Sequence, residues 1–352
     1  MSLGRVLAVA RRSLLELRHD KRLLSYALIT PIVLMVLFGL AFGGHVHDVK
    51  VVVVNDDGSF GSEFIGNLNA STFSVSKAGN LAEALEELKE GKCWAVIYFP
   101  ENPGEIRVYL DRSNTYIADA VVSGINAALM RTLEENGLRL PVRVSYNAVY
   151  GRNAKFMDTF LPGVMSLAVF LISTVLSILS FIGERNLGTL DRALASPLSE
   201  GEVVLGYSIA SGVIGTIQAA IMLSVAVFGF GVNVEGSLIL AFALVALLAI
   251  VGVNLGILLS NLARNEAQAV QFVPMIVVPT FLLSGIFWPV EAIPSYLQPL
   301  SYLLPPTYAV DSLRSVMIRG WGLDKIWGDV AVLLGFGVLF LGLAVLNMKR
   351  RR

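Results

Sequence analysis

Long uncharged stretches of apolar residues constrain the fold of this chain more than any other feature of its sequence. About 20 consecutive apolar residues are enough for a helix to cross the hydrocarbon core of a bilayer. Only 15% of the 352 residues are charged, against about 25% in an average soluble domain. We therefore expect a mostly α-helical membrane protein with six transmembrane helices. The six runs are Leu23–Gly44, Phe160–Gly183, Val203–Val234, Gly236–Ala263, Ala267–Val290 and Val330–Met348.

Individual residues refine the ends of the third and sixth runs and the interpretation of the first. Val203–Val234 is longer than a bilayer requires, so its Gly- and Asn-containing end, Gly229–Val234, is expected to be a loop. Asp329 is a candidate N-cap of the last helix. The alternative interpretation of the first run is a cleaved signal peptide, whose apolar core would be about 7–15 residues long and would be followed by an A-x-A cleavage site. Leu23–Gly44 is longer and lacks that site, so we expect it to remain as a transmembrane helix.

Residues 45–157 separate the first two runs and have the charged, mixed composition of a soluble fold. Val51–Val54 has the pattern of a buried strand closed by an Asn-Asp-Asp-Gly turn, and Asn80 is a candidate N-cap for a helix that ends at Gly91. Alternating strands and helices predict an α/β domain inserted between the first two transmembrane helices. Its further expected elements are strands Trp94–Phe99, Ile106–Leu110 and Val142–Val149 and helix Ile117–Leu133.

Residues 1–22 form a separate amphipathic segment before the first run. Its apolar residues repeat at helical spacing and its basic residues lie off that stripe, as in helices that lie in the membrane surface with the apolar face down. The alternative is a basic juxtamembrane segment that only sets the orientation of the chain. The apolar stripe consists of Leu3, Val6, Leu7, Ala10, Leu14 and Leu17.

Basic residues predict the orientation, because short cytosolic loops carry an excess of Lys and Arg. With six spans, both chain ends share one side of the membrane. That side holds thirteen basic residues in the N-terminal segment, the tail 349–352 and the short loops, whereas the short segments on the other side hold three. We therefore expect cytosolic termini and an extracytoplasmic domain at residues 45–157. The three outer basic residues are Arg314, Arg319 and Lys325.

A charged island, Glu184–Glu202, lies between the second and third runs on the expected cytosolic side. Three leucines in it fall at i, i+3 and i+7 and predict one apolar stripe on a short helix, with charged residues on the solvated faces. Pro197 is expected to end that helix, and Ser199 to Glu202 has the form of a capping box that begins the next one. A helix in so short a connection indicates a surface that a cytosolic partner contacts. The leucines are Leu187, Leu190 and Leu194, and the charged residues are Glu184, Arg185, Asp191 and Arg192.

The segment between the fifth and sixth runs, residues 288–328, is rich in proline and aromatic residues. Prolines cut it into short pieces, and Trp and Tyr are the residue types that settle at the level of lipid headgroups. We expect short re-entrant helices that dip into the outer leaflet without crossing it; a plain extracytoplasmic loop is the alternative. The aromatic residues are Trp288, Tyr296, Tyr302, Tyr308, Trp321 and Trp327.

The sequence lacks the groups that would let the chain drive transport by itself. No run contains an ionisable residue in its interior, whereas proton- and ion-driven carriers need one. No G-x-x-x-x-G-K-[ST] phosphate loop is present, so ATP would have to be bound by a partner. The zero net charge gives no support for nucleic-acid binding. Two weak candidate sites remain, a metal site at His45, His47 and Asp48 and a glycan acceptor at Asn69. Because Cys93 is the single cysteine of the sequence, an intrachain disulfide is excluded.

Two motifs and the layout of the chain resemble the permease subunits of type 2 ATP-binding-cassette (ABC) exporters. ERNLGTLDRALASPLS is similar to the cytosolic signature of that family, and the segment from Leu283 to Gly320 resembles its stretch between spans five and six. The large domain after span one also matches one branch, with Asp111 to Asn114 in the corresponding place. The cytosolic motif consists of Glu184, Arg185, Gly188, Thr189, Leu190, Leu194, Pro197, Leu198 and Ser199, and the outer motif of Ser284, Gly285, Pro289, Pro294, Pro305, Pro306, Asp311, Leu313 and Arg314.

This resemblance implies that the Leu187–Leu194 helix docks into a cleft on a separate ABC ATPase and transmits its closure. It also implies two permease copies, as a homodimer or heterodimer, with two ATPase subunits that bind ATP and Mg. The chain itself would then be no enzyme and would hold no cofactor. An eight-residue helix is only ~12 Å long, whereas a stable interface needs about 800 Å² per partner. We therefore expect the N-terminal helix and the Arg264 loop to share the docking.

The expected function is thus the membrane subunit of an ATP-driven exporter in the cell membrane. Uncharged spans dotted with small polar residues suit an amphipathic or apolar substrate, drug-like or lipid-like, more than an ion. The same polar side chains could instead bond to neighbouring helices. A membrane-anchored receptor or adhesion protein with a ligand-binding outer domain is the alternative function, although six spans exceed what an anchor needs. The polar residues are Ser173, Thr174, Ser177, Gln218, Asn254 and Gln271.

Overall fold

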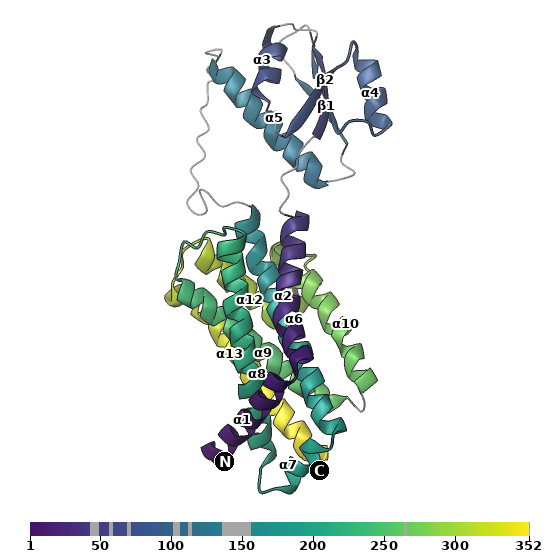
Figure 1. Cartoon of the computed structure of the whole chain (residues 1–352). Helices are drawn as coiled ribbons and strands as arrows, with labels where there is room; N and C mark the ends of the chain where they lie inside the picture. The colour runs from purple at the N-terminus through teal and green to yellow at the C-terminus, as the bar shows by residue number, and fades with distance from the viewer. Residues whose placement is uncertain are drawn as a thin grey trace. The chain divides into compact units, whose positions relative to one another are not determined.

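The computed structural model describes residues 1–42, 49–55, 59–68, 72–100, 106–111, 115–135, 156–263 and 266–351. The chain divides into two compact units, one formed by Met1–Gly43 with Ala148–Arg352 and the other by Gly44–Asn147. The first unit is helical, and the second contains a small sheet (Figure 1). Apart from Gly44, the second unit falls within the insert expected at residues 45–157, and the side of the membrane on which it lies stays a prediction.

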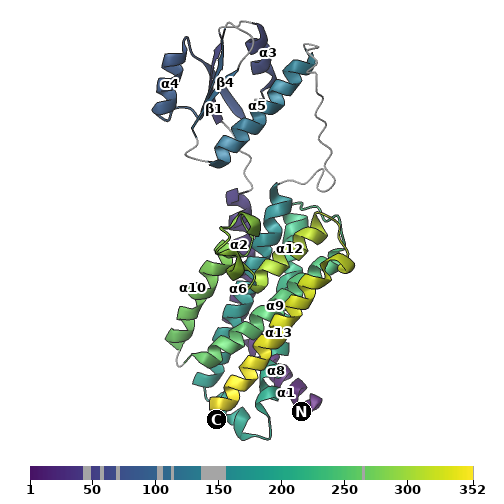
Figure 2. The same cartoon turned by 180° about the vertical axis from the view of Figure 1, so that it is seen from behind.

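The first unit is a bundle of long helices with α7 and both chain ends at one end (Figures 1 and 2). In the described part of the chain, five helices of this unit are long and apolar enough to cross a membrane, namely α2, α6, α8, α9 and α13. A π-helical turn, Val225–Gly229, extends α8. The helices are α1 (Leu3–His19), α2 (Lys21–Phe42), α6 (Phe156–Asn186), α7 (Thr189–Ala195), α8 (Glu200–Ser224), α9 (Leu238–Leu262), α10 (Glu266–Leu283), α11 (Gln298–Ser301), α12 (Pro305–Met317) and α13 (Leu323–Arg351).

The helix in the fifth expected span is shorter than its apolar run. Within Ala267–Val290, helix α10 ends at Leu283, because Gly285 takes a left-handed conformation with φ of +75° and a glycine there ends a helix. The expected N-cap at Asp329 is wrong, since α13 already begins at Leu323 and Asp329 lies inside it. The apolar run Val330–Met348 covers only the part of α13 that would lie in lipid, so it does not show where the helix begins. The loop expected at Gly229–Val234 is confirmed for residues 230–234, whereas Gly229 is the last residue of the π-helical turn.

Helices α6 and α9 form the tightly packed centre of the bundle. Gly252 and Gly256 of α9 bring its backbone against α6, and a Cβ atom on Gly256 would lie 2.4 Å from the carbonyl oxygen of Thr174 and 2.6 Å from the Cβ of Ser177. Small residues at i and i+4 allow this close approach of two helices in a membrane. Helices α6 and α9 therefore form a closely packed pair against which other helices of the bundle pack.

Helix α1 buries its apolar face against protein. Val6, Val9, Ala10 and Leu17 are buried, and the ideal Cβ position on Gly206 of α8 lies 2.5 Å from the Cγ1 of Val9. Part of the stripe that was expected to face lipid is therefore buried against protein, and the location of α1 in the membrane surface stays a prediction. Leu3 and Leu7 remain exposed at 74% and 53%, so a second apolar surface remains on α1 beside the buried one.

Among the residues of the second unit that the structure describes, four strands form a sheet with the order β2-β1-β3-β4. Strand β1 pairs in parallel with β2 and β3, and β4 is antiparallel to β3. Parallel strands need crossover connections, which helices α3 and α4 provide. The elements are β1 (Val49–Asn55), α3 (Ser59–Asn67), β2 (Phe73–Lys77), α4 (Leu81–Lys89), β3 (Ala95–Phe99), β4 (Arg107–Leu110) and α5 (Thr115–Glu135).

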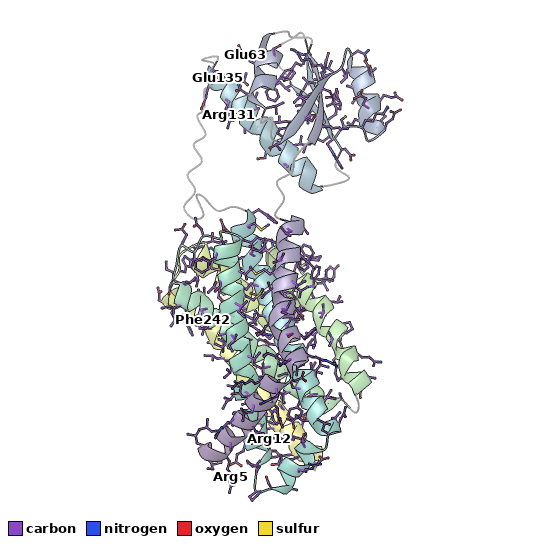
Figure 3. The ribbon with its side chains drawn as sticks, in the orientation of Figure 1. Arg5, Arg12, Glu63, Arg131, Glu135 and Phe242 are labelled. Atoms are coloured by element: carbon purple, nitrogen blue, oxygen red, sulfur yellow. The ribbon has the colours of Figure 1, made fainter. Side chains whose placement is uncertain are left out.

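Helices cover both faces of this sheet, with α3 and α5 on one side and α4 on the other (Figure 1). Asn67 of α3 donates a hydrogen bond to Glu135 of α5 at 2.7 Å, and Figure 3 labels Glu63, Arg131 and Glu135 on these two helices. The expected N-cap at Asn80 is confirmed, since its side chain accepts from the backbone N–H of Glu83.

Most expected elements of this unit are present as helices or strands. Helix α3 and strand β2 were not predicted. Strand β2 has only five residues, and only Phe73 and Val75 of these pack against the core. The expected strand Val142–Val149 lies outside the described residues, as do Asn69, His45, His47, Asp48 and the basic residue Arg264.

Candidate functional site

The connection between α6 and α8 carries its own helix, as the sequence predicts, but this helix begins later than expected. Gly188 has φ of +66° and precedes α7, which runs from Thr189 to Ala195. This left-handed residue breaks the helix between Leu187 and Leu190, so the expected three-leucine stripe is wrong at its first member. Leu187 lies in the turn and is 73% exposed. Leu187 is therefore an exposed apolar side chain that does not belong to the core of the unit.

The other two leucines hold α7 against the bundle. Leu190 is 6% exposed and belongs to a cluster with residues of α1, α6, α8, α9 and α13, and Leu194 packs against the same cluster. Phe181 of α6 and Tyr207 of α8 make an edge-to-face contact in it at 5.2 Å. A force on α7 would therefore reach five helices through one set of contacts.

The end of α7 and the start of α8 follow the predicted pattern. Ser196 caps the C-terminal end of α7 and Pro197 follows it, which agrees with the inability of proline to continue a helix. Ser199 and Glu202 form the expected capping box at the start of α8. Glu202 has a second role that the sequence did not reveal, because its carboxylate also accepts from the backbone N–H of Ser2 at 2.6 Å.

Glu184 is not on a solvated face, contrary to the expectation. Its side chain is 11% exposed and pairs with Arg12 of α1 at 2.9 Å. The hydroxyl of Thr189 contacts this carboxylate and lies 2.9 Å from the carbonyl oxygen of Glu184. Glu184 therefore joins the end of α6 to α1 and to the first residue of α7. The sequence contained Arg12 only as one basic residue off the apolar stripe, and its partner lies 172 positions away.

Arg185 is also turned inward rather than toward solvent. It donates hydrogen bonds to the carbonyl oxygens of Ser260 and Ala263 at 3.3 Å and 2.9 Å. These carbonyls belong to the C-terminal end of α9, where a cation is favoured by the helix dipole and by the unsatisfied carbonyl groups. The Glu184-Arg185 pair thus ties the end of α6 to α1 on one side and to α9 on the other.

A groove of about 610 Å³ separates α1 from α7 at this end of the bundle. Its apolar floor includes Val9 and Leu198, and its charged rim includes Arg5, Arg12, Glu16 and Arg192. Arg5 and Arg12 are labelled on α1 in Figure 3. Burial raises the pKa of Glu16, and its hydrogen bond with Glu184 raises this pKa further.

The segment between α10 and α13 is organised around Arg314 of α12. Its guanidinium donates to the carbonyl oxygens of Thr159, Gly285 and Ile286 at 2.9, 2.7 and 2.7 Å. One side chain therefore joins α12 to the start of α6 and to the turn after α10. This three-way contact was not predicted, although Arg314 was singled out by its motif.

The remaining residues of the outer motif occupy separate places in the same segment. Pro305 and Pro306 are buried in the first turn of α12, where the missing N–H of proline is tolerated. Ser284 and Gly285 are buried after α10, whereas Asp311 is exposed. Pro289 precedes a short 3₁₀ turn, and Pro294 is exposed after it. These residues shape a folded segment of short helices, and its depth in the membrane stays a prediction.

Comparison with known proteins places these features in a family. Residues 21–346 match the family described as ABC-2 family transporter protein. ABC transporter G family member 20 of Dictyostelium discoideum is 29% identical over 98% of this chain, and member 23 is 27% identical over 97%. The chain spans about half the length of these two relatives, at 50% and 52%.

Bacterial relatives have nearly the same length as this chain. The probable multidrug ABC transporter permease YbhS of Escherichia coli strain K12 is 24% identical over the whole chain and 98% of the relative. The permease YbhR of the same strain is 23% identical over 94% of both proteins. The match of one family over most of the sequence, including the α6–α8 connection and the Arg314 segment, leads to one conclusion. This chain belongs to the ABC-2 family of transporter proteins.

Proposed function

We propose that this chain is the permease of an ATP-driven exporter and that a separate ABC ATPase docks on the surface formed by α1, α7 and the groove between them. We call this surface the docking surface and define it by Arg5, Leu187, Arg192 and Leu198. The observation that carries the proposal is the convergence of five helices on Leu190 directly behind this surface. A partner that moves α7 would move the bundle.

The polar contacts support transmission rather than chemistry. Glu184 and Arg185 connect the end of α6 to α1 and α9, and the capping box continues α7 into α8. The 352 residues contain no phosphate loop of the G-x-x-x-x-G-K-[ST] type, so the ATP and Mg would be held by the partner. Energy would thus enter the chain as a mechanical displacement.

We further propose an amphipathic or apolar substrate and export out of the cytosol, with two permease copies around one path. The uncharged spans and the multidrug names of YbhS and YbhR support this substrate class. Exposed apolar side chains on α2 and α13 are consistent with contacts to lipid or to a second copy. The basic residues at the α7 end support a cytosolic location of the docking surface.

The docking surface can be tested without disturbing the core. Leu187 is 73% exposed, so Leu187→Asp should leave the fold intact and reduce co-purification of the co-expressed ATPase at least tenfold. Leu303 is 66% exposed in the segment before α12, and Leu303→Asp is the matched control that should keep the ATPase bound. Full co-purification with Leu187→Asp and Arg192→Glu combined would contradict the proposal.

A further inference from the structure

Two basic residues at the opposite end of the helical unit share one aromatic ring. The guanidinium carbon of Arg319 lies 4.8 Å from the ring centroid of Trp321, and the ammonium nitrogen of Lys325 lies 5.5 Å from the same centroid. Arg319 follows α12, and Lys325 is in the first turn of α13. Each contact is a cation–π interaction, which attracts the cation to the ring but leaves its charge uncompensated.

Among the described residues, neither Arg319 nor Lys325 forms an ion pair with a carboxylate. The nearby Asp324 carboxylate turns toward the backbone of Gly322, where its Oδ1 lies 2.6 Å from an ideal Cβ position. Lys325 also sits near the positive end of the α13 dipole, where a cation is disfavoured. Glu235 also lies beside the cluster, with its Cβ 3.7 Å from an ideal Cβ position on Gly320, but neither Asp324 nor Glu235 forms an ion pair with Arg319 or Lys325 in the described part of the chain. An external anion could therefore pair with both cations.

The cluster is held rigidly, as a binding site requires. The Trp321 side chain packs against the main core cluster of the bundle, and its backbone N–H donates to the carbonyl oxygen of Ser315 at 3.1 Å. Arg319 donates to the hydroxyl of the same Ser315 at 3.2 Å, and Gly320 makes the turn between them with φ of +69°. The guanidinium is thus fixed before any ligand arrives.

The surroundings of the cluster identify the source of the anion. Leu323 and Trp327, on the first turns of α13, are 54% and 67% exposed. Exposed Trp beside an apolar span is typical of the headgroup level of a bilayer. Phosphate is the anion present there at high local concentration, and guanidinium and ammonium groups both bind it.

We propose that Arg319, Lys325 and Trp321 form a binding site for the phosphate of an anionic phospholipid, with Trp321 as the fixed platform between the two cations. The site lies at the end of the bundle away from the docking surface and does not depend on ATPase docking. It would hold one lipid at the junction of α12 and α13, next to the segment that Arg314 organises.

The test uses Trp321 as its own reporter. The chain has four Trp residues, so replacing Trp94, Trp288 and Trp327 by Phe leaves one indole in the full-length protein. This variant is reconstituted into vesicles that contain either phosphatidylglycerol or phosphatidylcholine brominated near the headgroup. We expect brominated phosphatidylglycerol to quench Trp321 about tenfold more effectively at equal content, because each basic residue near a charged surface adds to the attraction.

Variants in the same single-Trp background separate the possible results. Arg319→Gln with Lys325→Gln should bring the quenching ratio of the two lipids to about one, whereas the charge-conserving pair Arg319→Lys and Lys325→Arg should keep a preference. Equal quenching by the two lipids in the unmodified cluster would overturn the proposal. Loss of the preference on addition of millimolar inorganic phosphate would also overturn it, by assigning the site to a soluble anion.

Discussion

Replacing Glu184 by Gln tests whether the carboxylate at the end of α6 fixes the position of α7. The substitution keeps the shape of the side chain and removes its charge. Glu184 pairs with Arg12 at 2.9 Å and contacts the hydroxyl of Thr189, while only 11% of its side chain is exposed. Glutamine can still accept both hydrogen bonds, so only the contribution of the charge to them is lost.

The size of the effect follows from these contacts. A hydrogen bond to a charged group contributes about 1.5–3 kcal/mol, against about 1 kcal/mol for a neutral one. Arg12 is 40% exposed, so solvent screens part of the stabilisation that the charge of Glu184 provides. We therefore expect Glu184→Gln to lower the free energy that holds α7 against the bundle by about 1.5 kcal/mol. This is about a tenfold increase in the population of states in which α7 has detached.

Glu16→Gln is the matched control. Glu16 pairs with the same Arg12 at the same 2.9 Å, but its side chain is 46% exposed, and exposed pairs of this kind contribute about 0.3–0.5 kcal/mol. Burial and Glu184 raise the pKa of Glu16 above its ordinary value of 4.5. Stability from this group is therefore present below that pH and is lost as the pH rises through the raised pKa. Removing its charge should leave α7 unchanged or slightly more stable at neutral pH.

The hydrogen-exchange rates of the α7 backbone amides measure how each variant changes the stability of this helix. The N–H of Arg192 donates to the carbonyl of Gly188 and that of Ser196 to Ala193, so their exchange rates report the opening of this helix. At pH 7 we expect about tenfold faster exchange in Glu184→Gln and unchanged or slightly slower exchange in Glu16→Gln. Equal rates in the two variants would refute the role assigned to the buried carboxylate.

Three further predictions concern other parts of the chain. Gly256→Ala should lower the free energy of unfolding by about 1–3 kcal/mol in a denaturation titration, because its Cβ would meet α6, whereas Gly335→Ala, with open space around it, should not. Arg314→Lys should lower it by a similar amount, since an ammonium group cannot reach three carbonyls in the geometry of the guanidinium. An unchanged value in either variant would contradict its contact. Cys93 is 3% exposed and burial raises the pKa of its thiol, so maleimide should label it only after denaturation, and fast labelling of the native protein at pH 7 would be inconsistent with its packing.

Local sequence signals predicted the parts of the fold that depend on neighbouring residues. The apolar runs marked five helices, and Ser199 with Glu202 and Asn80 marked helix starts, because caps involve residues three positions apart. The α7 stripe failed at Leu187, since helical spacing does not reveal that Gly188 takes a left-handed conformation. The start of α13 was missed because its first turn carries charged residues.

The contacts of the candidate site depend on residues far apart in the chain and could not be predicted. Glu184 and Arg185 belong to a recognisable motif, yet their partners lie on α1 and α9, 172 and 78 positions away. An amphipathic stripe such as that of α1 is equally suited to lipid or to protein, and only the packing against Gly206 distinguishes the two. The Arg314 contacts likewise join three separate elements.

In the proposed function, energy enters this chain from a partner through α7 and its leucine contacts. The most direct measurement is the movement of a fluorescent amphipathic dye against its gradient in vesicles that contain this protein, with and without its co-purified ABC ATPase and MgATP. We predict uphill transport only when the ATPase and MgATP are both present, and its loss in Leu187→Asp. Uphill transport by this chain alone would contradict the account.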